Sequence, residues 1–237
     1  EAGLGLRWDE AGERYVLVEP TTASSTVLHR AGAQGTRLAR GDARVDEAAE
    51  VTRRLGASRR LGGFLCLTVE ARFHADAVDA LRQRYPELAV QSLDGLLIDA
   101  MQRRASQKGA DWDVILVADA APPSSRDRAR LHGLAASVAD GMVDDLLATD
   151  GAVLALDAGL LLRYGLGRVL DTLRDRVGSV GTRLTGLWLL VPEESEEERP
   201  MLDGEPIPVL GHGQWLRLRR TWLEEYDRPS TAKELTA

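Results

Sequence analysis

Five short apolar runs, separated by segments of helical periodicity, constrain the fold of this chain more than any other feature of the sequence. They occupy residues 64–69, 88–91, 114–118, 152–156 and 187–191. Apolar runs that alternate with helical segments are typical of consecutive β-α-β units, which place parallel strands in one sheet. The sequence therefore predicts an α/β protein.

The third and fifth runs, VILVA at 114–118 and LWLLV at 187–191, are apolar throughout. Strands of this kind are covered by helices on both faces of a sheet. With right-handed crossovers, the pattern predicts a three-layer sandwich with a mainly parallel five-stranded sheet, Rossmann-like or degenerate P-loop/AAA-like. We expect the following side chains to lie in its core: Cys66, Leu116, Val117, Leu154 and Leu189.

Helical periodicity predicts helices near residues 46–55, 75–85, 93–106, 126–148 and 159–176, and Ser92 is the expected N-cap of the third. We divide the chain into an irregular β-rich preface (1–45), the α/β sandwich core (46–192), and an acidic loop with a C-terminal extension packed on the core (193–237). Both extensions are expected to be small and β-rich, with a tight β-turn at Asp203-Gly204.

Charge and cysteine content limit the classes of function. The 237-residue chain carries a net charge of −7, which argues against a domain whose main task is to bind nucleic acid. Its single cysteine, Cys66, lies in an apolar run, so no intrachain disulfide forms and a reducing cytoplasm is expected. No apolar stretch approaches membrane-spanning length and no leader is visible, so we expect neither insertion nor secretion. The missing initiator Met suggests a piece of a longer protein.

The candidate nucleotide site centres on Asp119, which follows the third apolar run as an acid follows a Walker B strand. Such a site needs a glycine-rich loop with a lysine after the first strand. Here that strand runs into residues 70–74 (EARFH), which contain neither glycine nor lysine. Asp119 is therefore either a structural cap or part of a degenerate nucleotide site.

Other catalytic and cofactor motifs are missing from the sequence. Gly165-Leu166-Gly167 is followed by Arg168 rather than by the third glycine of a dinucleotide-binding turn. The four histidines show no metal-ligand spacing, and no nucleophile elbow is present. We predict no catalytic residue, no metal site and no cofactor.

Arg217, Arg219 and Arg220, flanked by Trp215 and Trp222, form a candidate nucleic-acid surface, because guanidinium groups bind phosphate and aromatic rings stack on bases. The alternative is that the arginines pair with the acidic run at 193–198. The spacing of Trp215, Leu218 and Trp222 predicts one helical face that docks on the domain.

Several short sequence segments resemble those of a known family. They are residues 19–26 (EPTTASST), 62–69 (GGFLCLTV), 111–122 (DWDVILVADAAP), 159–164 (GLLLRY), 187–192 (LWLLVP) and 202–209 (LDGEPIPV). They resemble the C-terminal region of the large serine/threonine kinase of the bacterial phage growth limitation (type 2 BREX) defence system. The resemblance extends from about residue 15 to residue 223. The chain has no glycine-rich kinase loop, HRD or DFG motif, so no kinase residue is carried over.

The resemblance implies a non-catalytic accessory domain, for assembly or sensing, whose partners are other proteins of a phage-defence complex. The chain also resembles a degenerate AAA-type ATPase core, so the first alternative is a degenerate P-loop/AAA-like ATPase or nucleotide-binding module acting through Asp119. This resemblance implies a vestigial nucleotide face formed by the strand ends and the tip near Arg163 and Tyr164. The second is a nucleic-acid-binding module that uses the C-terminal arginines.

Overall fold

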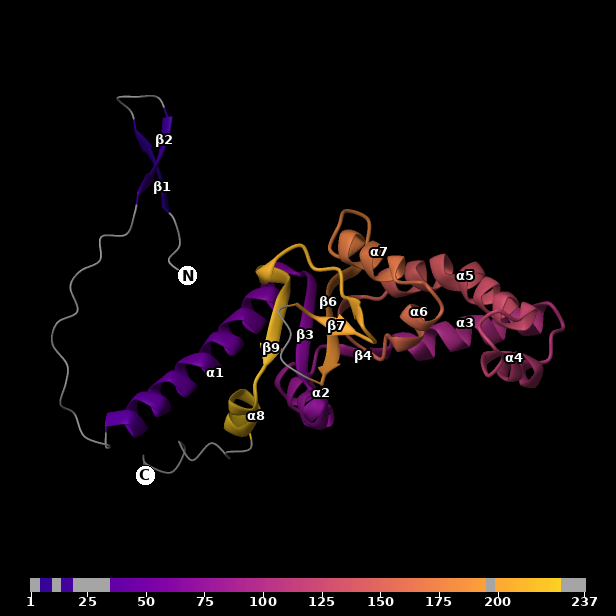
Figure 1. Ribbon diagram of the computed structural model, residues 1–237, viewed down its shortest axis with the longest axis horizontal. Helices are drawn as coiled ribbons and strands as arrows, with labels where there is room; N and C mark the ends of the chain where they lie inside the picture. The colour runs from indigo at the N-terminus through magenta and orange to yellow at the C-terminus, as the bar shows by residue number, and fades with distance from the viewer. Residues whose placement is uncertain (1–4, 10–13, 19–34, 195–198, 227–237) are drawn as a thin grey trace. The chain divides into compact units, whose positions relative to one another are not determined.

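A parallel sheet lies at the centre of residues 42–237 (Figure 1). Among the described residues its order is β4 (Ala89–Ser92), β5 (Gly151–Leu156), β6 (Leu184–Glu193), β3 (Gly63–Glu70) and β9 (Trp215–Leu218). All four pairings are parallel. The α/β class and the five-stranded parallel sheet predicted from the sequence are confirmed.

The computed structural model describes residues 5–9, 14–18, 35–194 and 199–226. The chain divides into two compact units, residues 1–41 and 42–237. In the first unit β1 (Gly5–Asp9) pairs antiparallel with β2 (Arg14–Val18).

Alternation along the central strands sends side chains into two separate cores. On β3, Cys66 faces one core and its neighbour Leu65 faces the other; on β6, Leu189 and Trp188 divide in the same way. The period-2 alternation of strand side chains thus produces three layers, helix, sheet and helix. Cys66, Leu154 and Leu189 are buried, as predicted.

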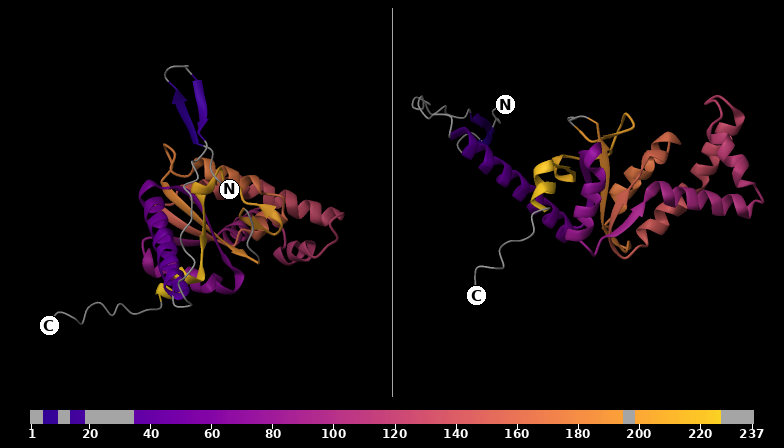
Figure 2. Two further views of the ribbon diagram at one scale, coloured as in Figure 1. Left: turned by 60° about the vertical axis from the view of Figure 1, so that its left-hand side comes forward. Right: turned by 90° about the horizontal axis from the view of Figure 1, so that it is seen from below.

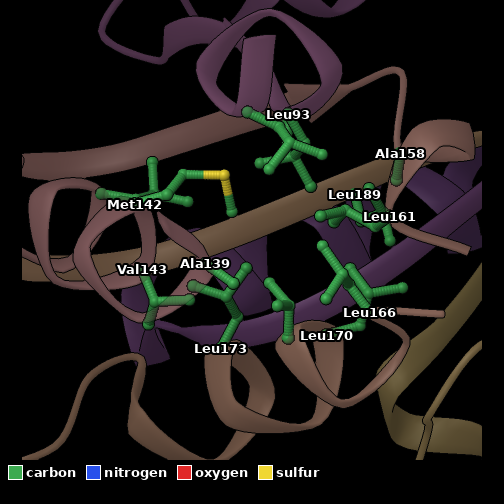
Figure 3. Packing of buried hydrophobic residues seen from close by; sticks show 14 of the residues in the cluster. Leu93, Ala139, Met142, Val143, Ala158, Leu161, Leu166, Leu170, Leu173 and Leu189 are labelled. Atoms are coloured by element: carbon green, nitrogen blue, oxygen red, sulfur yellow. The ribbon is translucent and has the colours of Figure 1, made fainter. Parts of the chain in front are cut away.

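Helices cover both faces of the sheet (Figures 1 and 2). One face packs against α1 (Gly35–Leu61), α2 (His74–Arg84) and α8 (Arg220–Tyr226). The other face packs against α3 (Leu93–Gln107), α5 (Arg126–Leu147), α6 (Gly159–Arg163) and α7 (Arg168–Arg176). Figure 3 shows this second core, where leucines of α7 meet Leu189 and the α5 side chains Ala139, Met142 and Val143.

The helix predicted at 159–176 is divided into α6 and α7. The break lies at Gly165, whose φ of +69° is a left-handed backbone conformation that ends the first helix and turns the chain. Ser92 caps α3 as predicted: its hydroxyl oxygen accepts a hydrogen bond from Gly95 N at 3.1 Å. The predicted turn at Asp203-Gly204 is also present, and it joins the two-residue strands β7 (Met201–Leu202) and β8 (Glu205–Pro206).

The third apolar run is a helix, α4 (Trp112–Asp119), so the prediction of a strand there was wrong. The Asp111 side chain caps this helix by accepting a hydrogen bond from Asp113 N at 2.9 Å. Leu116 and Val117, predicted to be core residues, are 53% and 72% exposed. A short, wholly apolar run fits a strand or a helix equally well, and here a helix cap decided between them.

The fifth strand is β9, which the sequence had placed in a helical face. Leu216 and Leu218 are buried while Trp215 and Arg217 are half-buried, the alternation of a strand beside β3. α8 begins only at Arg220. Burial of the tryptophans was predicted correctly, since Trp222 is 1% exposed and Trp215 is half-buried, but the single helical face was wrong: Trp215 packs against the core that contains Cys66, and Trp222 lies in the core that contains Leu65.

Helices α3, α4 and α5 extend beyond the β4 edge of the sheet as a helical arm (Figure 2). α4 packs on α3 and α5 through three half-buried side chains, Trp112, Ile115 and Ala118. None of its residues is fully buried. Within the described ranges, no helix is long and apolar enough to cross a membrane.

Candidate functional site

The carboxyl edge of a parallel sheet is where α/β proteins bind ligands. At this edge β3, which lies between β6 and β9, ends at Glu70, and the 3₁₀ turn η1 (Ala71–Phe73) leads directly into α2. The Arg72 Nε donates a hydrogen bond to the Glu70 carboxylate at 2.8 Å. A three-residue turn of this kind offers no ring of backbone amides for phosphate groups.

An acidic depression of about 410 Å³ lies beside this turn, and Asp94, Asp157, Asp203 and His74 contribute to its wall. Asp94 Oδ1 accepts a hydrogen bond from Leu160 N at 2.9 Å. Burial raises the pKa of Asp94 to about 6; the Leu160 amide opposes this shift, and the charges of Asp157 and Asp203 add to it. Three carboxylates at one edge repel a triphosphate.

In the part of the chain that the structure describes, no three histidine, cysteine or acidic side chains converge to hold a metal ion. The depression therefore supplies neither a phosphate cradle nor a metal centre among these residues.

The two residues of the candidate nucleotide site, Asp119 and Arg163, are in contact. Arg163 Nη2 lies 2.7 Å from Asp119 Oδ2, although the residues are 44 positions apart. Their position differs from the one expected, because Asp119 ends helix α4 in the arm and does not follow a strand of the sheet. The Walker B interpretation loses its structural basis, since the acid is held by arginines away from the strand ends.

Three further residues complete this network, and sequence reasoning did not assign two of them, Arg128 and His132, to a site. Arg128 Nη1 lies 3.1 Å from Asp119 Oδ1, and the Tyr164 hydroxyl donates to the same oxygen at 3.2 Å. Arg128 Nε also donates to His132 Nε2 at 3.2 Å. Burial, followed by the Asp119 charge, raises the pKa of Tyr164. The network ties the end of α4 to α5 and α6.

The C-terminal arginines lie near acids or aromatic rings. Arg217 Nε is 2.9 Å from Glu193 Oε2, and that carboxylate side chain is only 4% exposed. Arg219 pairs with Glu47 at 2.6 Å, and Arg220 with Glu224 at 2.5 Å. The Arg217 guanidinium also lies over the Trp215 ring. Guanidinium groups engaged in this way are less available to phosphates.

An apolar groove of about 580 Å³ lies between α4 and α5 on the surface of the arm. Its α4 wall includes Val114, Val117 and Ala118, and its α5 wall includes Leu131 and Leu134. Val114 is 66% exposed and Val117 is 72% exposed. The exposed apolar side chains of the groove come from α4, while on the α5 wall Leu134 is half-buried and Leu131 is buried at its base.

Sequence reasoning missed this surface because it assigned 114–118 to a buried strand. A signal was present: Val114, Val117, Ala118 and Ala121 follow the i, i+3, i+4, i+7 spacing of one helical face. Asp111 before the run was the matching N-cap signal.

These features define the class of protein: a three-layer α/β domain with a parallel sheet and a helical arm. No family model matches the chain, and no solved structure matches it. The chain is 31% identical, over 97% of its length, to the protein named Probable kinase PglW from Streptomyces coelicolor. The alignment spans 16% of that protein.

The resemblance to the kinase of the phage growth limitation system is thereby confirmed, and the chain is a relative of one region of a PglW-type kinase.

Proposed function

We propose that this chain is a non-catalytic accessory domain of a bacterial phage-defence serine/threonine kinase, and that it acts in assembly through protein contact. The observation that carries the proposal is the exposed apolar groove between α4 and α5. Contiguous exposed apolar surface costs free energy in water, and it is typical of sites that bind another protein.

The relationship to Probable kinase PglW supports the kinase context. The chain spans 16% of that protein, and we propose that the kinase activity belongs to other parts of it. The sequence of this chain fits a kinase activity located elsewhere in the protein, since the chain contains no HRD and no DFG motif. We place the domain in the cytoplasm, because its single cysteine, Cys66, is free and buried, which suits a reducing compartment.

The strand order supports an origin in a nucleotide-binding fold that has lost its phosphate-binding loop. The first strand of the sheet, β3, lies between the fourth, β6, and the fifth, β9, as in the AAA-type ATPase cores that the sequence resembled. At the phosphate-loop position stand Glu70 and the turn Ala71–Phe73. This segment lacks the glycines and the lysine of a phosphate cradle, which favours an assembly role over nucleotide hydrolysis.

The test is made in the complete kinase that contains this chain, within a reconstituted defence system. A Val114→Asp/Val117→Asp variant places two charges on the exposed groove without touching either core. We expect loss of phage resistance, measured as plaque number, while autophosphorylation of the kinase in vitro is retained.

Val180→Asp is the matched control, because Val180 is fully exposed in a loop between α7 and β6. This control is expected to keep both resistance and autophosphorylation. Full resistance in the groove variant would overturn the assembly role. Loss of autophosphorylation in the groove variant would contradict the separation of the domain from the kinase chemistry.

A further inference from the structure

We propose that the partner of the α4–α5 groove is a second copy of this chain, bound about a two-fold axis. The inference rests on the proposed assembly function and names the occupant of the groove. In the resulting four-helix contact, α4 of each copy enters the groove between α4 and α5 of the other.

The shape of the groove suits a helix. On α4, Val114, Val117 and Ala118 form one stripe, which Ala121 continues just after the helix, and on α5 Leu131 and Leu134 face it. Small side chains in the lining, among them Ala110 and Gly133, leave room for a close approach. Two facing stripes at helical spacing receive the ridge of a third helix. The exposed ridge of α4 is itself such a helix.

The charges at the two ends of the groove are complementary under a two-fold rotation. Exposed Lys108 lies just before α4 and exposed Asp113 in its first turn, while exposed Asp127 and Arg130 lie near the amino end of α5; of these four residues, all but Asp113 line the groove. Within one copy, the end of α4 meets the start of α5, because Asp119 contacts Arg128.

Antiparallel packing of two α4 helices therefore brings the amino end of α4 in one copy to the amino end of α5 in the other. This places Asp113 opposite the second copy's Arg130, and Lys108 opposite its Asp127. Each pairing occurs twice, as a two-fold interface requires. Within one copy Arg130 lies 3.2 Å from Asp127 in an exposed pair, which is weak and readily exchanged.

The experiment is sedimentation equilibrium on the chain, whose mass is 25.8 kDa. At tens of micromolar we expect a dimer of about twice that mass. Val114→Asp/Val117→Asp is expected to be monomeric, with the melting temperature that the parent shows at concentrations where it too is monomeric, since both valines are exposed in the single copy. Val180→Asp is expected to dimerise normally. A monomer at every concentration overturns the inference.

Charge reversal tests the two-fold pairing itself. Asp113→Arg and Arg130→Asp each place like charges together, so each variant alone is expected to dimerise at least about tenfold more weakly. Mixed together, they restore opposite charges at both ends, and a heterodimer is expected. Failure of the mixture to associate overturns the proposed packing.

The outcomes separate this inference from the proposed function. A monomeric chain whose groove variant still abolishes phage resistance would leave assembly intact and show that another protein occupies the groove. A monomeric chain whose groove variant keeps resistance would remove both proposals.

Discussion

The Asp119 carboxylate lies 2.7 Å from the Arg163 guanidinium and 3.1 Å from that of Arg128, and it joins the exposed helix α4 to α5 and α6. The side chain of Asp119 is 28% exposed, so the pairs are partly shielded from water. α4 contributes no fully buried residue to the core. Its position therefore depends on this carboxylate more than a core helix would depend on one side chain.

Asp119→Ala is expected to loosen α4. Loss of charged hydrogen bonds at a partly exposed site costs about 1 to 3 kcal/mol. We expect faster amide hydrogen exchange at 112–119 and little change in the sheet strands, measured by mass spectrometry. Asp140→Ala, on the exposed surface of α5, is the control and should leave exchange unchanged. Equal protection of α4 in both variants would show that packing alone holds it.

A pair of leucine substitutions distinguishes the real core from the predicted one. Leu154→Ala removes a fully buried side chain of β5 and is expected to cost about 2 to 5 kcal/mol in unfolding free energy. Leu116→Ala, at a residue 53% exposed on α4, is expected to stay within about 0.5 kcal/mol. Urea unfolding at concentrations where the chain is monomeric measures both, and similar losses would contradict the structure of α4.

Asp94 provides a pH dependence with a defined sign. Its pKa of about 6 in the folded chain exceeds the ordinary value near 3.8, so the folded state binds the proton more tightly. Ionisation of Asp94 therefore lowers the free energy of unfolding as the pH rises from about 4 through 6.

Asp94→Asn removes that ionisation and keeps an oxygen to accept from Leu160 N. The variant and the parent are expected to be similar near pH 4, with the variant more stable at pH 7.5. The gain should be at most about 1 kcal/mol, because the side chain is partly solvated. Urea unfolding at both pH values checks this, and a gain at pH 4 that vanishes at pH 7.5 would reverse the assigned sign.

The ion pair between Glu193 and Arg217 joins the end of β6 to β9. Arg217→Ala leaves a carboxylate that is 4% exposed without this guanidinium, and the expected loss is about 3 to 5 kcal/mol. The double variant Glu193→Gln/Arg217→Met, which removes both charges, should recover most of it. Thermal unfolding compares the three proteins, and a double variant as unstable as Arg217→Ala would argue against a charge effect.

The C-terminal arginines give a prediction for nucleic acid. Since Arg217, Arg219 and Arg220 lie 2.9 Å or less from carboxylates, we expect only weak binding of single-stranded DNA at about 50 mM salt. Fluorescence anisotropy with a labelled oligonucleotide measures it. Tight, salt-sensitive binding that a triple alanine variant abolishes would instead favour the nucleic-acid alternative.

Much of the architecture could be predicted from residues close together in the sequence. Four of the five strands, the cap at Ser92 and the turn at Asp203-Gly204 follow from local pattern and turn chemistry. Burial of Cys66, Leu154 and Leu189 followed from their places in apolar strands. The family resemblance could also be recognised without the structure, because it rests on short sequence segments alone.

Tertiary structure decided which apolar segments enter the sheet and which side chains meet. The run 114–118 is as apolar as a central strand, yet it stays outside the sheet as a helix that packs on the core only through Trp112, Ile115 and Ala118. Residues 215–218 carry helical spacing, yet the free edge of β3 recruits them as a strand by offering backbone hydrogen bonds. Contacts such as Asp119 with Arg163 join residues far apart in the chain. No local pattern encodes such pairs, because they exist only once the strands and helices have packed.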